Sequence, residues 1–96
     1  MTFIEAGNGV PSCSSVAAEP LENMSKCRKY AEKMKYSWQS LIRTRDSPKG
    51  CNLRLHDQHV FWNDQYGQAQ EGVSPVCTSK LIFINIVQEG IIDLII

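Results

Sequence analysis

The chain has 96 residues, which is room for one domain, and its ten basic and ten acidic residues cancel. A neutral chain has no basic patch to displace counterions from phosphate, so its charge argues against nucleic acid as a partner. At this size a hydrophobic core alone leaves a domain only marginally stable.

Four cysteines supply candidate covalent links: Cys13, Cys27, Cys51 and Cys77. Their even number and wide spacing favour a disulfide framework, for which three connectivities exist. A structural zinc site usually brings its ligands in close pairs such as C-x-x-C, so we expect no metal and no other cofactor.

Disulfides imply an oxidising compartment, and we expect the module to be extracellular, either secreted or part of an ectodomain. Residues 1–10 show no signal peptide, because they have neither a basic start nor an apolar core. We therefore expect the chain to be a piece of a longer secreted protein, or to carry an incorrectly chosen start.

The first segment, residues 1–22, predicts a loop or a short strand, because glycine and proline interrupt any periodicity. A helix is predicted next, from about residue 24 to residue 35, with Asn23 as its N-cap. Asn23 also begins the sequon Asn-Met-Ser, an acceptor for N-glycosylation in a secreted protein. The apolar positions of the helix recur at helical spacing: Met24, Cys27, Tyr30, Ala31 and Met34.

The remaining helix positions are mainly basic, and Glu22 and Glu32 interrupt the cluster. This pattern is typical of a solvated helix face, and it predicts no nucleic-acid site. The basic residues are Lys26, Arg28, Lys29, Lys33 and Lys35.

After Gly50 the period becomes two, which predicts a strand at 51–55, a turn at 57–58 and a partner strand at 59–63. Val60 and Trp62 are expected on the core face with the two leucines of the first strand, leaving Phe61 on the opposite face. Residues 64–74 predict a loop, and 75–78 predict a short edge strand, where proline is tolerated. The expected fold class is α+β: one amphipathic helix packed on a small antiparallel sheet and stapled by disulfides.

The expected packing also predicts which cysteines pair. A helix that buries Cys27 against the leucines of the hairpin places its sulfur near Cys51. Cys13 and Cys77 lie at the two ends of the module, where a bridge would tie the terminal segments together. We therefore predict the pairs Cys27–Cys51 and Cys13–Cys77.

Residues 4–79 resemble an uncharacterised cysteine-rich module of secreted and surface proteins of algae and other unicellular eukaryotes. The matching elements are a first cysteine, a helix with a second one, P-x-G-C, a V-Y-F-N-like strand, a glycine-containing loop and a closing P-I-C. They fall at Cys13, Cys27, 48–51, 60–63, Gly67 and 75–77.

A helix-borne cysteine followed by G-C-x-L is also similar to the apple/PAN fold, a module that binds carbohydrate or protein. The helix lacks the second cysteine usual in that fold, and Asn52 stands where the P-x-G-C pattern favours an aromatic or apolar residue. Both resemblances imply an extracellular binding module, and neither implies an active site.

Enzyme chemistry finds no support in the sequence. His56 and His59 flank the predicted turn without a nearby third metal ligand, so we interpret them as surface histidines. Ser, His and Asp residues lack a frame such as G-x-S-x-G, and no glycine-rich phosphate loop occurs. All four cysteines are better explained as paired than as nucleophiles.

The outer face of the hairpin and its loop is the candidate recognition surface. Phe61 and Tyr66 are expected to stack on sugar rings or to fill a partner's pocket. The alternative for Phe61 is packing under the N-terminal segment or the tail, and for Asn63 it is bridging the following loop. Trp62 is expected in the core. Polar contacts would come from His56, Asp57, His59 and Asn63.

Two functions remain open at this point. The chain is either a non-catalytic recognition or adhesion module that binds glycan or protein, or a structural spacer repeat with no ligand of its own. Further copies of the cysteine pattern in a longer protein would favour the spacer.

The C-terminal tail, residues 80–96, differs in composition from the cysteine-rich module at 1–79. Its two apolar runs are each too short to span a bilayer, so we expect no transmembrane span. They are compatible with a hairpin, a membrane-surface segment, an aggregation-prone tail, or coding sequence that does not belong to the domain.

Removal of residues 81–96 is expected to raise solubility without lowering the stability of the module. The segment is rich in β-branched isoleucine, which is poorly soluble when exposed, and it follows the closing cysteine of the framework. Thermal melts of the full and truncated chains decide the matter. A truncated chain that melts several degrees earlier would make the tail part of the fold.

Overall fold

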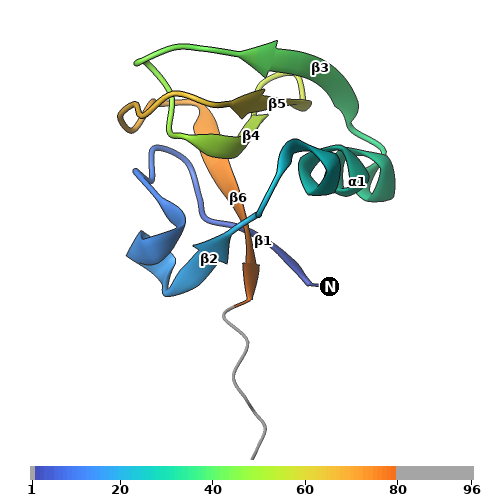
Figure 1. Cartoon of the computed structure of the whole chain (residues 1–96), viewed down its shortest axis with the longest axis horizontal. Coiled ribbons are helices and arrows are strands. Elements are labelled where there is room, and N and C mark those ends of the chain that lie inside the picture. The colour runs from blue at the N-terminus through green and yellow to red at the C-terminus, as the bar shows by residue number, and fades with distance from the viewer. Residues whose placement is uncertain (1, 80–96) are drawn as a thin grey trace, which may run out of the picture.

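The computed structural model describes residues 2–79, and the tail lies outside the described residues. One helix packs on a mixed sheet of six strands (Figure 1), which confirms the small disulfide-stapled α+β class. The elements in chain order are β1 (Phe3–Glu5), the 3-10 helix η1 (Cys13–Val16), β2 (Ala18–Pro20), α1 (Met24–Met34), β3 (Ser37–Ile42), β4 (Gly50–Arg54), β5 (His59–Asn63) and β6 (Val73–Ser79).

Helix α1 begins and ends for local reasons. Asn23 is extended and its Oδ1 accepts a hydrogen bond of 3.0 Å from the backbone N–H of Lys26, which is the predicted N-cap. The helix ends at Met34 because Lys35 adopts a left-handed φ of 61°. The N–H of Tyr36 then donates back to the carbonyl of Ala31 at 2.9 Å, closing the last turn.

The β4–β5 hairpin pairs Leu53 with Val60 and Cys51 with Trp62, so these four side chains share one face. Phe61 lies on the opposite face, as predicted. The expectation for Leu55 was wrong. This residue lies beyond β4 in the turn, where its side chain is exposed.

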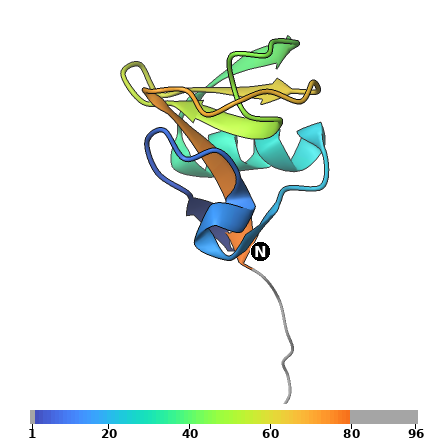
Figure 2. The same cartoon turned by 90° about the vertical axis from the view of Figure 1, so that its left-hand side faces the viewer.

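The main core forms where α1 crosses the hairpin face, and Figure 2 shows the helix lying along the sheet. Alternate residues of the strands and every third or fourth residue of the helix are apolar and face each other there. Their contact removes the apolar face of the sheet and that of the helix from water. The buried residues of this core are Leu21, Cys27, Tyr30, Ala31, Cys51, Leu53, Val60 and Val76.

Strand β3 was not predicted, and it makes the sheet mixed rather than purely antiparallel. It runs parallel to β5, with a register shift between Trp38 and Leu41. Its inward positions are only half-buried, and Leu41 points outward. A half-buried strand of this kind shows little of the apolar alternation that reveals a strand in sequence.

Strand β6 was predicted at an edge of the sheet, and this was wrong. Residues 73–75 pair with β4, residues 76–78 pair with β1 on one side, and residues 77–79 pair with β2 on the other. Pro75 lies where β6 stops pairing with β4 and begins to pair with β1 and β2. Its carbonyl accepts a hydrogen bond of 2.9 Å from the N–H of Ala6. A missing N–H costs least at such a change of partner.

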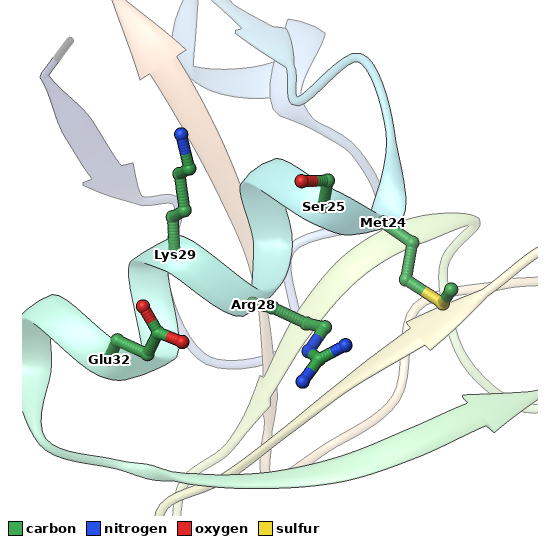
Figure 3. Close-up of a pocket in the computed structure, with 5 residues that line it drawn as sticks. All are labelled: Met24, Ser25, Arg28, Lys29 and Glu32. Atoms are coloured by element: carbon green, nitrogen blue, oxygen red, sulfur yellow. The ribbon is translucent and has the colours of Figure 1, made fainter.

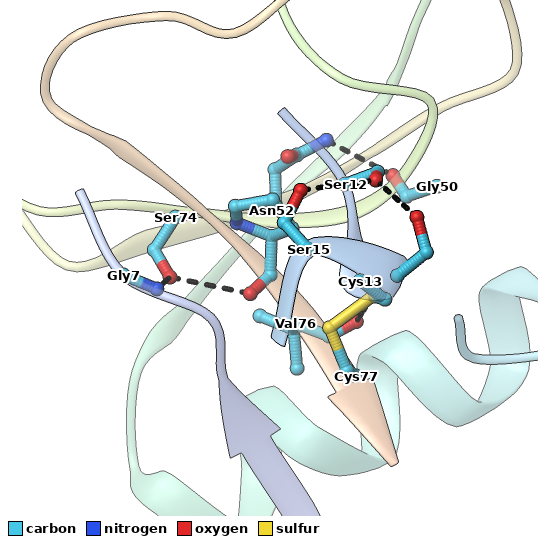
Figure 4. The surroundings of a disulfide bond; sticks show 11 residues. Gly7, Ser12, Cys13, Ser15, Gly50, Asn52, Ser74, Val76 and Cys77 are labelled. Carbon is cyan, nitrogen blue, oxygen red and sulfur yellow. Dashed lines mark hydrogen bonds between the residues drawn. A yellow bond between two sulfur atoms is a disulfide. The ribbon is translucent and has the colours of Figure 1, made fainter. Parts of the chain in front are cut away.

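Both disulfides join the predicted cysteines. Cys27 pairs with Cys51 at a Cα–Cα distance of 5.4 Å, which links α1 to β4. Cys13 pairs with Cys77 at 5.8 Å, which links η1 to β6 (Figure 4). Nearby, the hydroxyl of Ser74 accepts from the N–H of Gly7 at 2.9 Å, so the N-terminal loop is tied to the same strand.

The double substitution Cys27→Ala with Cys51→Ala is expected to unfold the module at physiological temperature. Opening a link between residues 24 apart removes about 3.5 kcal/mol in the chain-entropy model, which is most of the stability of a domain near the lower end of the usual range of about 5–15 kcal/mol. Thermal melts under non-reducing conditions measure the effect. A double variant that melts within a few degrees of the parent would show that the helix is held to the sheet by packing alone.

Candidate functional site

Two loops, residues 43–49 and 64–68, meet at the open end of the β4–β5 hairpin, opposite its turn. The side chain of Asn63 joins them. Asn63 is fully buried, and its Nδ2 donates to the carbonyls of Thr44, Ser47 and Pro48 at 2.9, 3.0 and 3.2 Å. Its Oδ1 accepts from the backbone N–H groups of Thr44 and Gln65. Asn63 therefore bridges the loops and does not face a ligand, which was the alternative left open by the sequence.

Asn52 supports the first of these loops from the neighbouring strand. Its Nδ2 donates to the carbonyl of Pro48 at 2.8 Å and to that of Gly50 at 3.1 Å, and the residue is fully buried. This role accounts for a polar residue after the P-x-G-C cysteine, because an apolar side chain would leave these carbonyls without the amide donor.

The second loop packs directly on the first, backbone against backbone. A Cβ added at Gly67 would lie 2.0 Å from the carbonyl oxygen of Ser47, so this position admits only glycine without a shift of the chain. The N–H of Gln68 donates to the carbonyl of Arg45 at 3.1 Å. Residues 43–49 and 64–68 thus form one continuous, hydrogen-bonded unit.

This unit presents a surface that we call the Tyr66 surface, consisting of Arg45, Lys49 and Tyr66. Tyr66 is 80% exposed, the largest exposed fraction among the large apolar and aromatic residues described. The ammonium of Lys49 lies 4.1 Å from the centroid of the Tyr66 ring, within the range of a cation–π contact. The sequence predicted Tyr66 as a contact residue, but it gave no sign of Lys49 or Arg45.

Phe61 does not belong to this surface. It is 3% exposed, and it lies on the face of the hairpin that also carries Asn52 and Asn63. The structure therefore corrects the expectation that its ring stacks on a ligand. Trp62 is half-buried and packs against the main core, on the side expected for it.

The two histidines lie at the β4–β5 turn around the carboxylate of Asp57. His59 Nδ1 is 2.7 Å and His56 Nε2 is 3.7 Å from Asp57 Oδ2, and the His56 side chain is 77% exposed. Arg54 donates to both oxygens of Asp57, and these bonds hold the pKa of that carboxyl well below its usual range. Asp57 is thus engaged within the turn, and only His56 faces outward freely.

The exposed side of α1 carries a shallow hollow of about 270 Å³ (Figure 3). Arg28 reaches toward the strands and lies 5.8 Å from the Trp38 ring, whereas Lys29 points to the other side of the helix. All lining residues belong to this one helix, so the hollow is a gap between neighbouring surface side chains. They are Met24, Ser25, Arg28, Lys29 and Glu32.

Among residues 2–79, no three His, Cys, Asp or Glu side chains gather in a way that would hold a metal ion. No helix in this part of the chain has both the length and the apolar character to cross a membrane. Searches of family models, curated proteins and solved structures found no match to the chain.

Asn63→Asp is expected to destabilise the domain by about 3 kcal/mol or more at neutral pH, because a buried carboxylate would face three carbonyl oxygens. Burial would raise the pKa of the new carboxyl above its unfolded value of about 4. The loss should therefore be smallest below pH 4 and grow as the pH rises toward the raised pKa of the folded state.

Urea unfolding at pH 4 and pH 7 tests this expectation. Gln65→Glu is the control, since it adds the same charge to the next loop at a partly exposed position, and its effect should stay within about 0.5 kcal/mol. Equal losses in both variants would show that the amide of Asn63 is not what joins the loops.

Proposed function

We propose that this chain is a non-catalytic extracellular recognition or adhesion module, and that the Tyr66 surface contacts its glycan or protein ligand. The observation that carries the proposal is that Tyr66 is exposed to solvent although the loop that bears it is held firmly by the rest of the domain. The ring is 80% exposed, yet its loop is held by the buried amide of Asn63 and by the close approach at Gly67. A rigidly presented aromatic ring with little core contact is typical of a binding residue.

Several features support the extracellular part of the proposal. Two disulfides are stable where the surroundings are oxidising. The sequon at Asn23 is exposed, and only the Oδ1 of that side chain is used as the helix cap. The resemblance to apple/PAN modules agrees with both, since those modules bind carbohydrate or protein outside the cell.

Tyr66→Ala is expected to reduce ligand binding roughly 30-fold, the effect of about 2 kcal/mol at a contact residue, while leaving the melting temperature unchanged. The measurement is a screen of the purified full chain against a glycan array and a panel of extracellular proteins, followed by titration of the hits. Leu55→Ala is the matched control, because it also removes an exposed apolar side chain, here from the β4–β5 turn.

A hit that both variants bind equally well would exclude the Tyr66 surface. A screen without any hit would instead favour the structural spacer.

A further inference from the structure

We infer that the ligand of the Tyr66 surface is an acidic glycan, one that carries carboxylate or sulfate groups. This inference rests on the proposed function and narrows it. It follows from three side chains on the two joined loops. The ring of Tyr66 is open to solvent, and neither Lys49 nor Arg45 has an acidic partner among residues 2–79.

The ring and the ammonium are already arranged as such a ligand requires. Lys49 Nζ lies over one face of Tyr66, and a ring that is 80% exposed leaves the other face and its edge open. The apolar face of a sugar ring can pack on the open side, while the ammonium meets a negative group at the edge. Because the ammonium is already held against the aromatic ring, less side-chain freedom is lost on binding.

Arg45 adds a second exposed cation in the loop that carries Lys49. Its carbonyl accepts from the N–H of Gln68, two residues after Tyr66, so the two loops cannot separate at this point without breaking that bond. Within residues 2–79, neither Arg45 nor Lys49 forms an ion pair, whereas Arg43 is paired with Asp64 in the same loops. Carboxylates and sulfates are suited to the planar fork of a free guanidinium.

The basic face of α1 is the competing surface for a polyanion, but three of its cations already contact other side chains of the domain. Lys26 pairs with Glu22 at 2.8 Å, and Arg28 lies over Trp38. Lys33 likewise lies 5.7 Å from the centroid of a phenylalanine ring of β1. On α1 an anionic ligand would compete with Glu22 for Lys26, whereas neither Lys49 nor Arg45 has an acidic partner within residues 2–79.

The loop that carries Arg45 and Lys49 also carries an acidic residue. Asp46 is exposed and lies in the same loop, directly after Arg45. If the ligand is anionic, this carboxylate opposes binding. Removing its charge should then strengthen binding, whereas removing the charge of Lys49 should weaken it. A neutral ligand would respond little to either change.

The experiment measures the affinity of the full chain for a uronic-acid oligosaccharide, for its carboxyl-reduced neutral form, and for sulfated and desulfated pairs. We expect the acidic member of each pair to bind at least about 10-fold more tightly, the effect of one charge-assisted hydrogen bond. Lys49→Gln should lose about 10-fold and Asp46→Asn should gain about 2-fold, both effects shrinking at high salt. Lys29→Gln is the control, because it removes the same charge from α1.

The outcomes separate this inference from the function that it rests on. Binding of acidic and neutral forms with equal affinity, abolished by Tyr66→Ala, would overturn the acidic-glycan inference and leave the recognition function standing. A loss on Lys29→Gln equal to that on Lys49→Gln would overturn it in favour of α1. Binding only to acidic peptides, or no Tyr66-dependent binding at all, would also overturn it, and the last result would remove the proposed site as well.

Discussion

The disulfide between Cys27 and Cys51 is the constraint on which the rest of the structure depends. It joins the only α-helix among residues 2–79 to a central strand of the sheet, and both cysteines are buried in the core that the two elements share. A domain of this size buries too little apolar surface for packing alone to provide a wide margin of stability. The covalent link lowers the entropy of the unfolded chain, and that allows the remainder of the molecule to be polar.

That polar remainder is concentrated on the other face of the hairpin. Asn52 and Asn63 occupy positions where apolar residues would usually complete a second core layer, and both are fully buried. Their amides donate to the carbonyls of Ser47 and Pro48, so hydrogen bonds hold the loops in place of apolar packing. The result is a rigid loop pair whose aromatic side chain, Tyr66, remains in solvent. Buried amides on this face hold the loops in position, while the aromatic ring of Tyr66 stays outside the core.

Elements with a strong local signal were predictable. The N-cap at Asn23, the helix that follows it, and the core face shared by Leu53 and Val60 all depend on residues close together in the chain. Strand β3 gave no such signal, because its partner β5 lies beyond a loop and the whole of strand β4, and because the burial of β3 is only partial. The interior position of β6 was missed for a related reason: it depends on pairing with β1, some seventy residues earlier in sequence.

The sequence by itself determined the helix, the hairpin and the neutral charge, because spacing and composition express these features directly. Cysteine spacing left three connectivities open, and the expected packing of the helix on the hairpin selected the pairs that the structure shows. It also singled out Tyr66, although it placed Phe61 beside it. Only the tertiary structure decided that Phe61 is buried, that Lys49 lies over Tyr66, and that the loop of Arg45 is hydrogen-bonded to the loop of Tyr66. The physical reason is that exposure and charge pairing are set by contacts between loops, and the buried amide of Asn63, rather than any local pattern, brings those loops together.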